Sequence, residues 1–223
     1  MSLNDLEKRV YDEVSQYLGK DESGHGMDHI ERVFLLAFQL AKEEVIDRDV
    51  LGLIALLHDV DDAKLFGEEA AKELRQAKII MQTCRIKADR QAQVLAEIRR
   101  IGFKKRMRGI IPISIEAKLV SDADMLDALG AHGILRTYDY GKSQNHLFFD
   151  RDCFPSNDPL YPTEPSINHF FEKLLRLEGL MLTEKGKKEA AHRSRVMRLF
   201  LKSYFAEEGA TDWLNYLAQF DER

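Results

Sequence analysis

The sequence predicts an all-α fold, and three observations lead to this prediction. Apolar residues recur at i, i+3, i+4 and i+7 through most of the chain, the spacing of one face of a helix. Runs that alternate apolar and polar residues, the pattern of a half-buried strand, are weak throughout. Several apolar segments also begin with aspartate or serine and end at glycine, which are residues typical of helix termini.

The helical pattern divides the chain into segments separated by glycines, prolines and short polar runs. Two segments lack it. Residues 102–109 form a basic loop between two glycines, and residues 141–165 hold four of the five prolines. A long irregular stretch of this kind is often a binding loop or a lid. We predict helices over residues 3–18, 28–44, 47–59, 68–81, 87–101, 114–129, 131–140, 166–177, 183–208 and 211–220.

The composition is that of an ordinary globular protein, with 44% hydrophobic and 32% charged residues. The formal net charge of −5 gives no indication of a nucleic-acid-binding surface. Cys84 and Cys153 are too few for a disulfide framework and lack the spacing of a zinc site. We expect no secretory signal and no membrane-spanning segment, and therefore a cytoplasmic location.

An apolar helix that ends in a histidine and several aspartates is the most informative stretch of the chain. Leu51, Ile54, Ala55, His58 and Asp62 share one helical face, and Asp59 directly follows the histidine. An ionised carboxylate buried alone costs several kcal/mol or more, and in proteins it is paired or binds a metal. The sequence therefore predicts a positive partner at the end of this helix.

Two other segments offer residues that suit the same partner. His29 lies near the start of an amphipathic helix, on the face that carries Val33, Leu36, Ala37 and Leu40. Nitrogen and carboxylate ligands suit Zn, Mn, Fe or Co, and carboxylate-rich sites also suit Mg. An apolar helix further along the chain contains three aspartates, Asp122, Asp124 and Asp127. The helical pattern allows both Asp122 and Asp124 to point inward and does not choose between them.

Other charged residues are candidates for contacts with a substrate. Asp62 follows His58 by four residues, so its carboxylate is placed to exchange a proton with a water at the same site. Lys64, Arg32 and Arg136 suit phosphate oxygens, although a solvated or ion-paired side chain is the favoured explanation for any one of them. The basic residues of the 102–109 loop are expected to be solvated rather than part of a site: Lys104, Lys105, Arg106 and Arg108.

Three motifs follow one another along the chain: His29-x-x-Arg32-Val33, His58-Asp59 and the aspartate-rich segment 122–128. In this combination they resemble the HD-domain metal-dependent phosphohydrolases. The resemblance covers about residues 20–205 and extends to a bacterial subgroup of small stand-alone HD hydrolases. The segments that resemble this subgroup are residues 24–29, 58–64, 122–134 and 168–175.

The resemblance implies a helical bundle around one divalent ion, whether Mn, Mg, Fe, Co, Ni or Zn. It implies His29, His58, Asp59 and Asp124 as the ligands, with Asp62 as the group that activates water. No histidine lies within residues 60–121, which favours one metal over two. The whole chain is then a single HD domain, residues 1–223, with a core over about 20–140 and a C-terminal helical extension over about 166–220. One departure is Gly102-Phe103-Lys104, where relatives often carry Ser-Phe-Ser.

The activity that the resemblance implies is hydrolysis of a phosphate ester or anhydride, with a small phosphorylated molecule such as a nucleotide as substrate. Release of pyrophosphate from a nucleoside triphosphate is the first expectation, and a nucleotide monophosphatase is the second. Lys64 and Arg136 would offset charge on the phosphoryl oxygens. The alternative is a module that senses a nucleotide without turnover, in which the metal only stabilises the helices.

Overall fold

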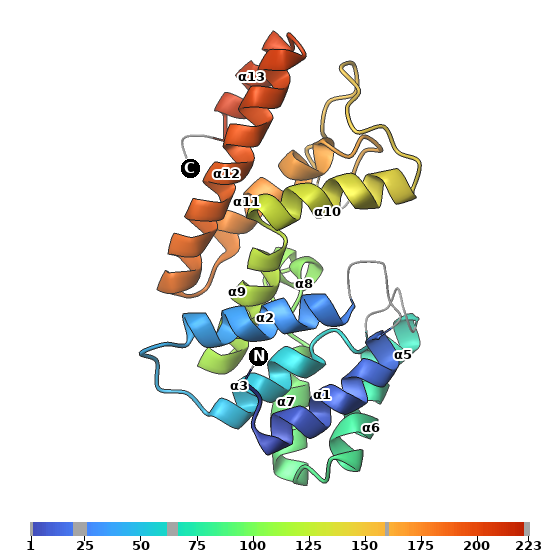
Figure 1. Cartoon of the computed structure of the whole chain (residues 1–223), viewed down its shortest axis with the longest axis vertical. Helices are drawn as coiled ribbons and strands as arrows, with labels where there is room; N and C mark the ends of the chain where they lie inside the picture. Colours follow the sequence, from blue (N-terminus) through green and yellow to red (C-terminus); the bar gives the residue numbers. More distant parts are fainter. Residues whose placement is uncertain (1, 20–25, 62–66, 159–160, 221–223) are drawn as a thin grey trace. The chain divides into compact units, whose positions relative to one another are not determined.

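The computed structural model describes residues 2–19, 26–61, 67–158 and 161–220 (Figure 1). Within these ranges the chain is helical and contains no strand, so the predicted all-α fold is confirmed. Across the same ranges, no helix combines the length and the apolar character needed to cross a membrane. The chain divides into two compact units, residues 1–124 and residues 125–223.

Unit 1 is built around α3, the most completely buried of its helices. All eight residues from Val50 to Leu57 are buried, and α1, α2 and α7 each pack against this helix (Figure 1). The direction of α3 therefore fixes where its C-terminal residue His58 lies. The described helices of unit 1 are α1 (Asp5–Leu18), α2 (Met27–Leu40), α3 (Arg48–Leu57), α5 (Glu68–Glu73), α6 (Arg75–Thr83), α7 (Ala88–Ile98), α8 (Phe103–Met107) and most of α9 (Ile115–Asp127).

Two carboxylates fix the start of α3. The side chain of Asp47 accepts hydrogen bonds from the backbone N–H groups of Asp49 and Val50, both at 3.1 Å, which makes it the N-cap. The buried carboxylate of Glu116 in turn accepts from the backbone N–H of Asp47 at 2.8 Å. The sequence prediction of a helix start at this aspartate is confirmed.

The predicted helix over residues 68–81 is wrong, because the structure divides it into α5 and α6. Leu74, between the two helices, adopts a left-handed conformation with φ of 51°. The carboxylate of Asp61 accepts hydrogen bonds from the N–H groups of Gln76 and Ala77, at 2.8 and 2.9 Å. Burial raises the pKa of this carboxyl, and the two N–H groups act against that rise. A contact with a residue 15 positions upstream thus begins a new helix, which local periodicity does not reveal.

A buried carboxylate also fixes the start of α9, the helix that carries Asp124. Glu97, near the end of α7, accepts hydrogen bonds from the backbone N–H groups of Ile113 and Ser114, at 3.0 and 2.8 Å. The hydroxyl of Ser114 accepts from the N–H of Ala117 at 3.2 Å, as expected of the predicted N-cap. The two oxygens of Glu97 therefore tie α7 to the segment that leads into α9.

Unit 2 is organised around the long helix α12. α10, α11 and α13 each contact it. Gly133 lets the start of α10 pass close to the preceding turn, because a Cβ atom there would lie 2.1 Å from the backbone carbonyl oxygen of Ala128. The same Cβ would lie 2.9 Å from the Cε of Met197 on α12. The described helices of unit 2 are α10 (Gly130–Ser143), the π-helix η1 (Phe170–Leu174), α11 (Leu175–Leu177), the 3-10 turn η2 (Glu178–Leu180), α12 (Glu184–Glu207) and α13 (Thr211–Ala218).

The predicted irregular stretch 141–165 is confirmed in most of its described part, although α10 continues to Ser143. The buried carboxylate of Glu172 holds this stretch in place. Its Oε1 accepts from the N–H of Ser156 at 2.8 Å, and from the N–H and hydroxyl of Thr163 at 3.0 and 2.8 Å. Glu172 lies in η1, so the regular α-helix predicted over 166–177 includes a π-helical turn.

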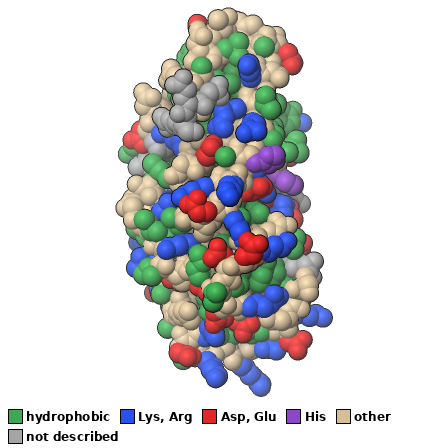
Figure 2. Space-filling model, turned by 90° about the vertical axis from the view of Figure 1, so that its left-hand side faces the viewer, with side chains coloured by type: hydrophobic (Ala, Val, Ile, Leu, Met, Phe, Trp, Pro, Cys, Tyr) green, Lys and Arg blue, Asp and Glu red, His purple; other side chains and the backbone are tan. Residues whose placement is uncertain are grey.

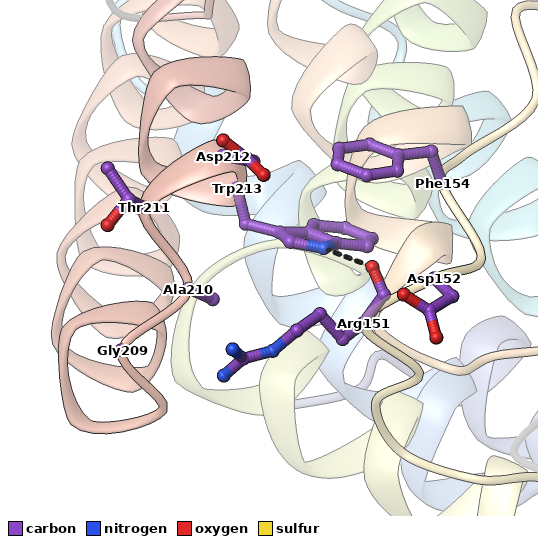
Figure 3. A pocket seen from close by; sticks show the side chains of 8 residues that line it. All are labelled: Arg151, Asp152, Phe154, Gly209, Ala210, Thr211, Asp212 and Trp213. Atoms are coloured by element: carbon purple, nitrogen blue, oxygen red, sulfur yellow. Dashed lines mark hydrogen bonds between the residues drawn. The ribbon is translucent and has the colours of Figure 1, made fainter.

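A pocket of about 390 Å³ lies within unit 2, between residues 151–154 and the turn from α12 to α13 (Figure 3). The indole N–H of Trp213 donates to the carbonyl of Arg151 at 3.0 Å, and the Phe154 ring stacks on the indole at 4.5 Å. Trp213 is fully buried, so its indole belongs to the aromatic core and leaves no open face for a ligand.

Replacing Glu97 by glutamine should destabilise unit 1. A glutamine has one acceptor oxygen, so its amide N–H₂ would face one of the two N–H donors that the carboxylate now accepts. We expect a loss of about 1–3 kcal/mol in the free energy of unfolding, measured by urea denaturation. The control is Glu44→Gln, the same exchange at an exposed position. It should change the free energy of unfolding by under about 0.5 kcal/mol. Equal effects of the two variants would contradict the role of Glu97.

Candidate metal centre

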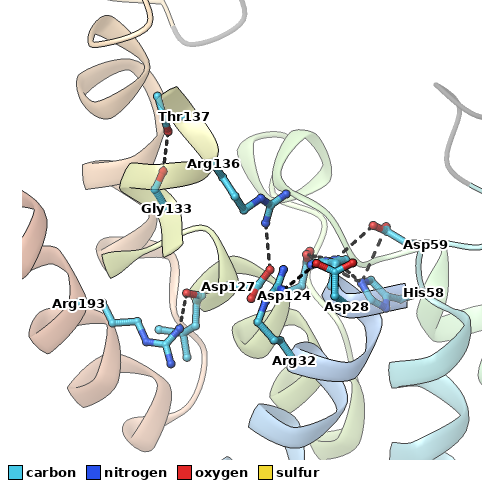
Figure 4. Close-up of polar contacts among 12 residues, drawn as sticks. Asp28, Arg32, His58, Asp59, Asp124, Asp127, Gly133, Arg136, Thr137 and Arg193 are labelled. Atoms are coloured by element: carbon cyan, nitrogen blue, oxygen red, sulfur yellow. Dashed lines mark hydrogen bonds and ion pairs between the residues drawn. The ribbon is translucent and has the colours of Figure 1, made fainter. Parts of the chain in front are cut away.

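Four side chains of unit 1, from three helices and a turn, converge on one point. His29 lies in the first turn of α2, His58 ends α3, Asp59 follows it, and Asp124 lies on α9. Both imidazoles are buried, whereas the side chains of Asp59 and Asp124 are 19% and 24% exposed. Figure 4 shows His58, Asp59 and Asp124 turned toward one another. The site is therefore buried on the histidine side and partly open on the carboxylate side.

The donor atoms of these side chains are close together. The Nε2 atoms of His29 and His58 are 3.3 Å apart. The Nε2 atom of His29 lies 3.4 Å from Oδ2 of Asp59 and 3.6 Å from Oδ1 of Asp124. The Nε2 atom of His58 lies 3.9 Å from an oxygen of each carboxylate. One donor atom from each of His29, His58 and Asp59 can be chosen so that all three lie within 4.8 Å of one another.

A hydrogen bond determines which nitrogen of His58 faces the site. Its Nδ1 lies 2.9 Å from the backbone carbonyl of Ala55, one turn earlier in α3. A carbonyl oxygen only accepts, so Nδ1 carries the hydrogen and donates. In the neutral ring the lone pair is then on Nε2, the atom directed at His29. This arrangement, in which one nitrogen donates to the protein and the other is left as a ligand, is typical of metal-binding histidines.

The donor set fits a divalent cation. A nitrogen lone pair and two carboxylates directed at one point repel one another unless a positive charge lies among them. Ligands bound at about 2.1 Å are about 3.0 Å apart when they subtend a right angle, and about 3.4 Å apart at the tetrahedral angle. The separations of 3.3, 3.4 and 3.6 Å around His29 agree with such spacing. Two imidazoles and two carboxylates suit Mn, Fe, Co, Ni or Zn, and do not distinguish among them.

The helical pattern left open whether Asp122 or Asp124 is the fourth ligand, and the structure shows where these aspartates lie. Asp124 has an oxygen within 4 Å of both imidazoles. Asp122 is fully buried within α9, and Asp127 is 2% exposed. Asp124 as the fourth ligand stays a prediction, with which its distances to the two imidazoles agree.

The remaining predicted site residues are placed as follows. Asp62 and Lys64 lie outside the described residues. Arg136, on α10, donates to Asp127 at 2.9 Å within unit 2 (Figure 4). Arg32 donates to Asp28 one turn earlier in α2, at 3.2 Å. Burial alone would raise the pKa of Asp28, but the hydrogen bond and charge of Arg32 hold it below its usual value.

One basic residue near the site was missed by sequence reasoning. The predicted solvated loop over residues 102–109 contains the short helix α8, and Lys105 on this helix is partly buried. Burial lowers the pKa of its ammonium, while the charges of Asp59 and Asp124 act to raise it. The sequence offers no signal that separates Lys105 from its basic neighbours, because the difference arises from the fold of α7 and α8.

Comparisons with known proteins give the family of the chain. The family model described as "HD domain" matches residues 26–129. YpgQ of Bacillus subtilis is 33% identical over 193 residues, which cover 85% of this chain and 87% of YpgQ. The crystal structure of YpgQ in complex with ADP covers 88% of this chain and 97% of YpgQ, with a TM-score of 0.70 and 27% identity after structural superposition.

Two further crystal structures cover nearly the whole chain. A protein of Lactobacillus plantarum is 34% identical, covers 94% of this chain and all of its own, and has a TM-score of 0.80. An HD-superfamily hydrolase of Bacillus thuringiensis is 36% identical, covers 92% of this chain and 97% of its own, and has a TM-score of 0.71. The chain belongs to the HD-domain phosphohydrolase superfamily and is a metal-dependent hydrolase.

Proposed function

We propose that this hydrolase cleaves a phosphoanhydride bond of a nucleotide, with a nucleoside triphosphate converted to the monophosphate and pyrophosphate. The observation that carries the proposal is the approach of His29, His58, Asp59 and Asp124. The two Nε2 atoms lie 3.3 Å apart, and each lies 3.4–3.9 Å from an oxygen of both carboxylates. That YpgQ forms a complex with ADP supports a substrate with a nucleoside and a diphosphate group.

The four side chains are proposed to hold one divalent ion, which would polarise a phosphoryl oxygen and acidify a water molecule. Asp62 follows the His58-Asp59 pair closely in sequence, and we assign it the role of taking a proton from the attacking water. Lys64 and Arg136 are assigned to the phosphate oxygens, where positive charge stabilises the transition state.

We propose a small molecule as the substrate and no nucleic-acid partner. A net charge of −5 disfavours a polyanion. Figure 2 shows Lys and Arg side chains interspersed with Asp and Glu over the face in view, rather than gathered into a basic stripe. The cytoplasm is the proposed location.

A panel of nucleoside tri-, di- and monophosphates with several divalent metals tests the proposed reaction. Pyrophosphate and inorganic phosphate are measured separately. We expect pyrophosphate and the monophosphate in equal amounts from a triphosphate, with no turnover after treatment with a chelator. Phosphate release from monophosphates instead would identify a monophosphatase. Absence of any turnover across the panel would contradict both reactions.

Replacing His58 by alanine should remove bound metal and hydrolysis together, because the variant lacks one buried nitrogen of the site. We expect near-stoichiometric metal in the parent protein and under about a tenth of that in His58→Ala, by elemental analysis. His132→Ala, which removes an exposed histidine, is the control and should leave both quantities unchanged. Normal turnover of His58→Ala with a full complement of metal would reject the assignment.

Asp62→Asn separates an enzyme from a sensing module. The exchange keeps the size of the side chain and removes its basicity, so an enzyme that needs a proton acceptor should lose about 10²–10⁴-fold in rate. Nucleotide affinity, measured by calorimetry, should change little. A sensor has no need of the carboxylate, so binding without turnover in both forms would favour the sensing alternative.

A further inference from the structure

Residues 99–113, which we call the basic segment, differ in charge from the rest of the chain. They include six Lys and Arg residues and no acidic residue, although the formal net charge of the chain is −5. The nearest acidic residues on either side in sequence are Glu97 and Glu116, and both are buried. Their carboxylates accept backbone N–H groups inside the fold. The basic segment therefore presents positive charge alone to the solvent.

The exposed cations of the basic segment have no counter-charge. Arg99, Lys104 and Arg108 are exposed, and among the described residues none of the three forms an ion pair. Lys105 donates to the backbone carbonyl of Ile98 at 3.2 Å, which holds α8 against the end of α7 and so keeps these cations in one region. Unpaired cations gathered in this way attract an anionic partner.

Large apolar side chains are exposed in the same segment. Met107, Ile110, Ile111 and Ile113 are each between 39% and 66% exposed. Pro112, which lies between the last two isoleucines, is buried. The chain therefore turns Pro112 toward the interior and directs the isoleucines on either side of it toward the solvent. Exposed aliphatic groups that follow one another along the chain indicate a surface that contacts something apolar.

Hydrogen bonds fix the backbone that carries these side chains. The N–H of Gly109 donates to the carbonyl of Arg106 at 3.0 Å, and Gly109 has φ of 75°. The N–H of Ile110 donates to the carbonyl of Lys105, also at 3.0 Å, so α8 ends in a Schellman motif. Further along, the N–H of Ile113 donates to the buried carboxylate of α7. The isoleucines thus extend from an ordered part of the fold.

The chemistry of the basic segment favours a membrane surface over other anionic partners. Its exposed apolar groups are aliphatic, whereas the bases of a nucleic acid stack on aromatic side chains. Protein interfaces are enriched in aromatic residues and depleted in lysine. Lys and Arg beside aliphatic side chains match the boundary of an anionic bilayer, where phosphate head groups lie next to acyl chains.

We propose that the basic segment is a peripheral binding site for an anionic lipid membrane. Its cations complement the negative head groups, and the side chains of Met107, Ile110, Ile111 and Ile113 enter the boundary between head groups and acyl chains. The two contributions act together, since a weak apolar anchor gives stable binding only when basic residues assist it. The protein then lies on the membrane surface, and this role does not depend on the proposed reaction.

Co-sedimentation with vesicles tests the proposal. Vesicles of phosphatidylcholine and phosphatidylglycerol in equal parts are compared with vesicles of phosphatidylcholine alone. We expect the parent protein to bind the anionic vesicles and to leave the neutral ones unbound. Binding should be about tenfold weaker at ~0.5 M salt than at ~0.05 M, because salt screens the attraction between cations and head groups.

A charge variant with a matched control locates the binding surface. Lys104→Gln/Arg108→Gln should bind the anionic vesicles about 10- to 30-fold more weakly, since each basic residue at the surface contributes to the attraction. Lys8→Gln/Arg9→Gln removes the same two charge types from exposed positions on α1. This control should change the affinity less than threefold.

An apolar variant tests insertion separately from charge. Ile113→Ser should weaken vesicle binding about fivefold, because less apolar surface leaves the water. Leu147→Ser is the control, since Leu147 in unit 2 has the same exposed fraction, 66%. It should leave the affinity unchanged. All four variants should unfold within about 2 °C of the parent protein, which shows that weaker binding does not come from a damaged fold.

Several results would overturn the proposal. These are equal binding to neutral and anionic vesicles, no binding to either, or control variants as weak as the variants of the basic segment. The same holds if a single-stranded oligonucleotide binds and anionic vesicles do not, which would assign the basic segment to a nucleic acid.

Discussion

The structure of unit 1 depends on how it accommodates two imidazole nitrogens and two carboxylates directed at one point. The nitrogens of His29 and His58 are 3.3 Å apart, and the Ala55 carbonyl fixes His58 with its lone pair facing inward. Such a cluster of electron-rich atoms is unfavourable without a positive charge among them. A divalent cation among these atoms would remove that cost.

The helices around the cluster hold its donors from several directions. α3 is apolar and buried along its length, so the position of His58 follows from the packing of α1, α2 and α7 against it. α9 contributes Asp124, and its start is fixed by the carboxylate of Glu97. The carboxylates of Glu97, Glu116 and Asp61 accept backbone N–H groups and order the chain. The acidic residues of this chain therefore serve two purposes: buried ones order the backbone, and the partly exposed ones near the imidazoles suit a metal.

Much of this arrangement can be predicted from the sequence because it depends on local patterns. The helical periodicity of residues 3–18 and 183–208 gives α1 and α12 to within a few residues. The sequence His58-Asp59 at the end of an apolar run indicates a buried polar site, and His29 on the inward face of α2 indicates a second group. These patterns predict which residues point inward, and the resemblance to HD-domain enzymes relates them to one site.

The features that the sequence does not reveal arise from contacts between distant residues. The break at Leu74 follows from the hydrogen bonds of Asp61 to the start of α6, and the π-helical turn at η1 occurs where Glu172 holds the loop of Ser156 and Thr163. Lys105 differs from Lys104 in being partly buried and in donating to the carbonyl of Ile98. Asp122 and Asp124 both satisfy the helical pattern, and the approach of Asp124 to within 4 Å of both imidazoles arises from the fold.

The most direct test of the account is to locate the metal itself. Crystals grown with Mn²⁺ and measured at a wavelength with strong anomalous scattering from manganese would show where the ion binds. The account predicts one strong peak within bonding distance of Nε2 of His29, Nε2 of His58 and the carboxylates of Asp59 and Asp124. A peak bound elsewhere, or none at a concentration that saturates the protein, would contradict it.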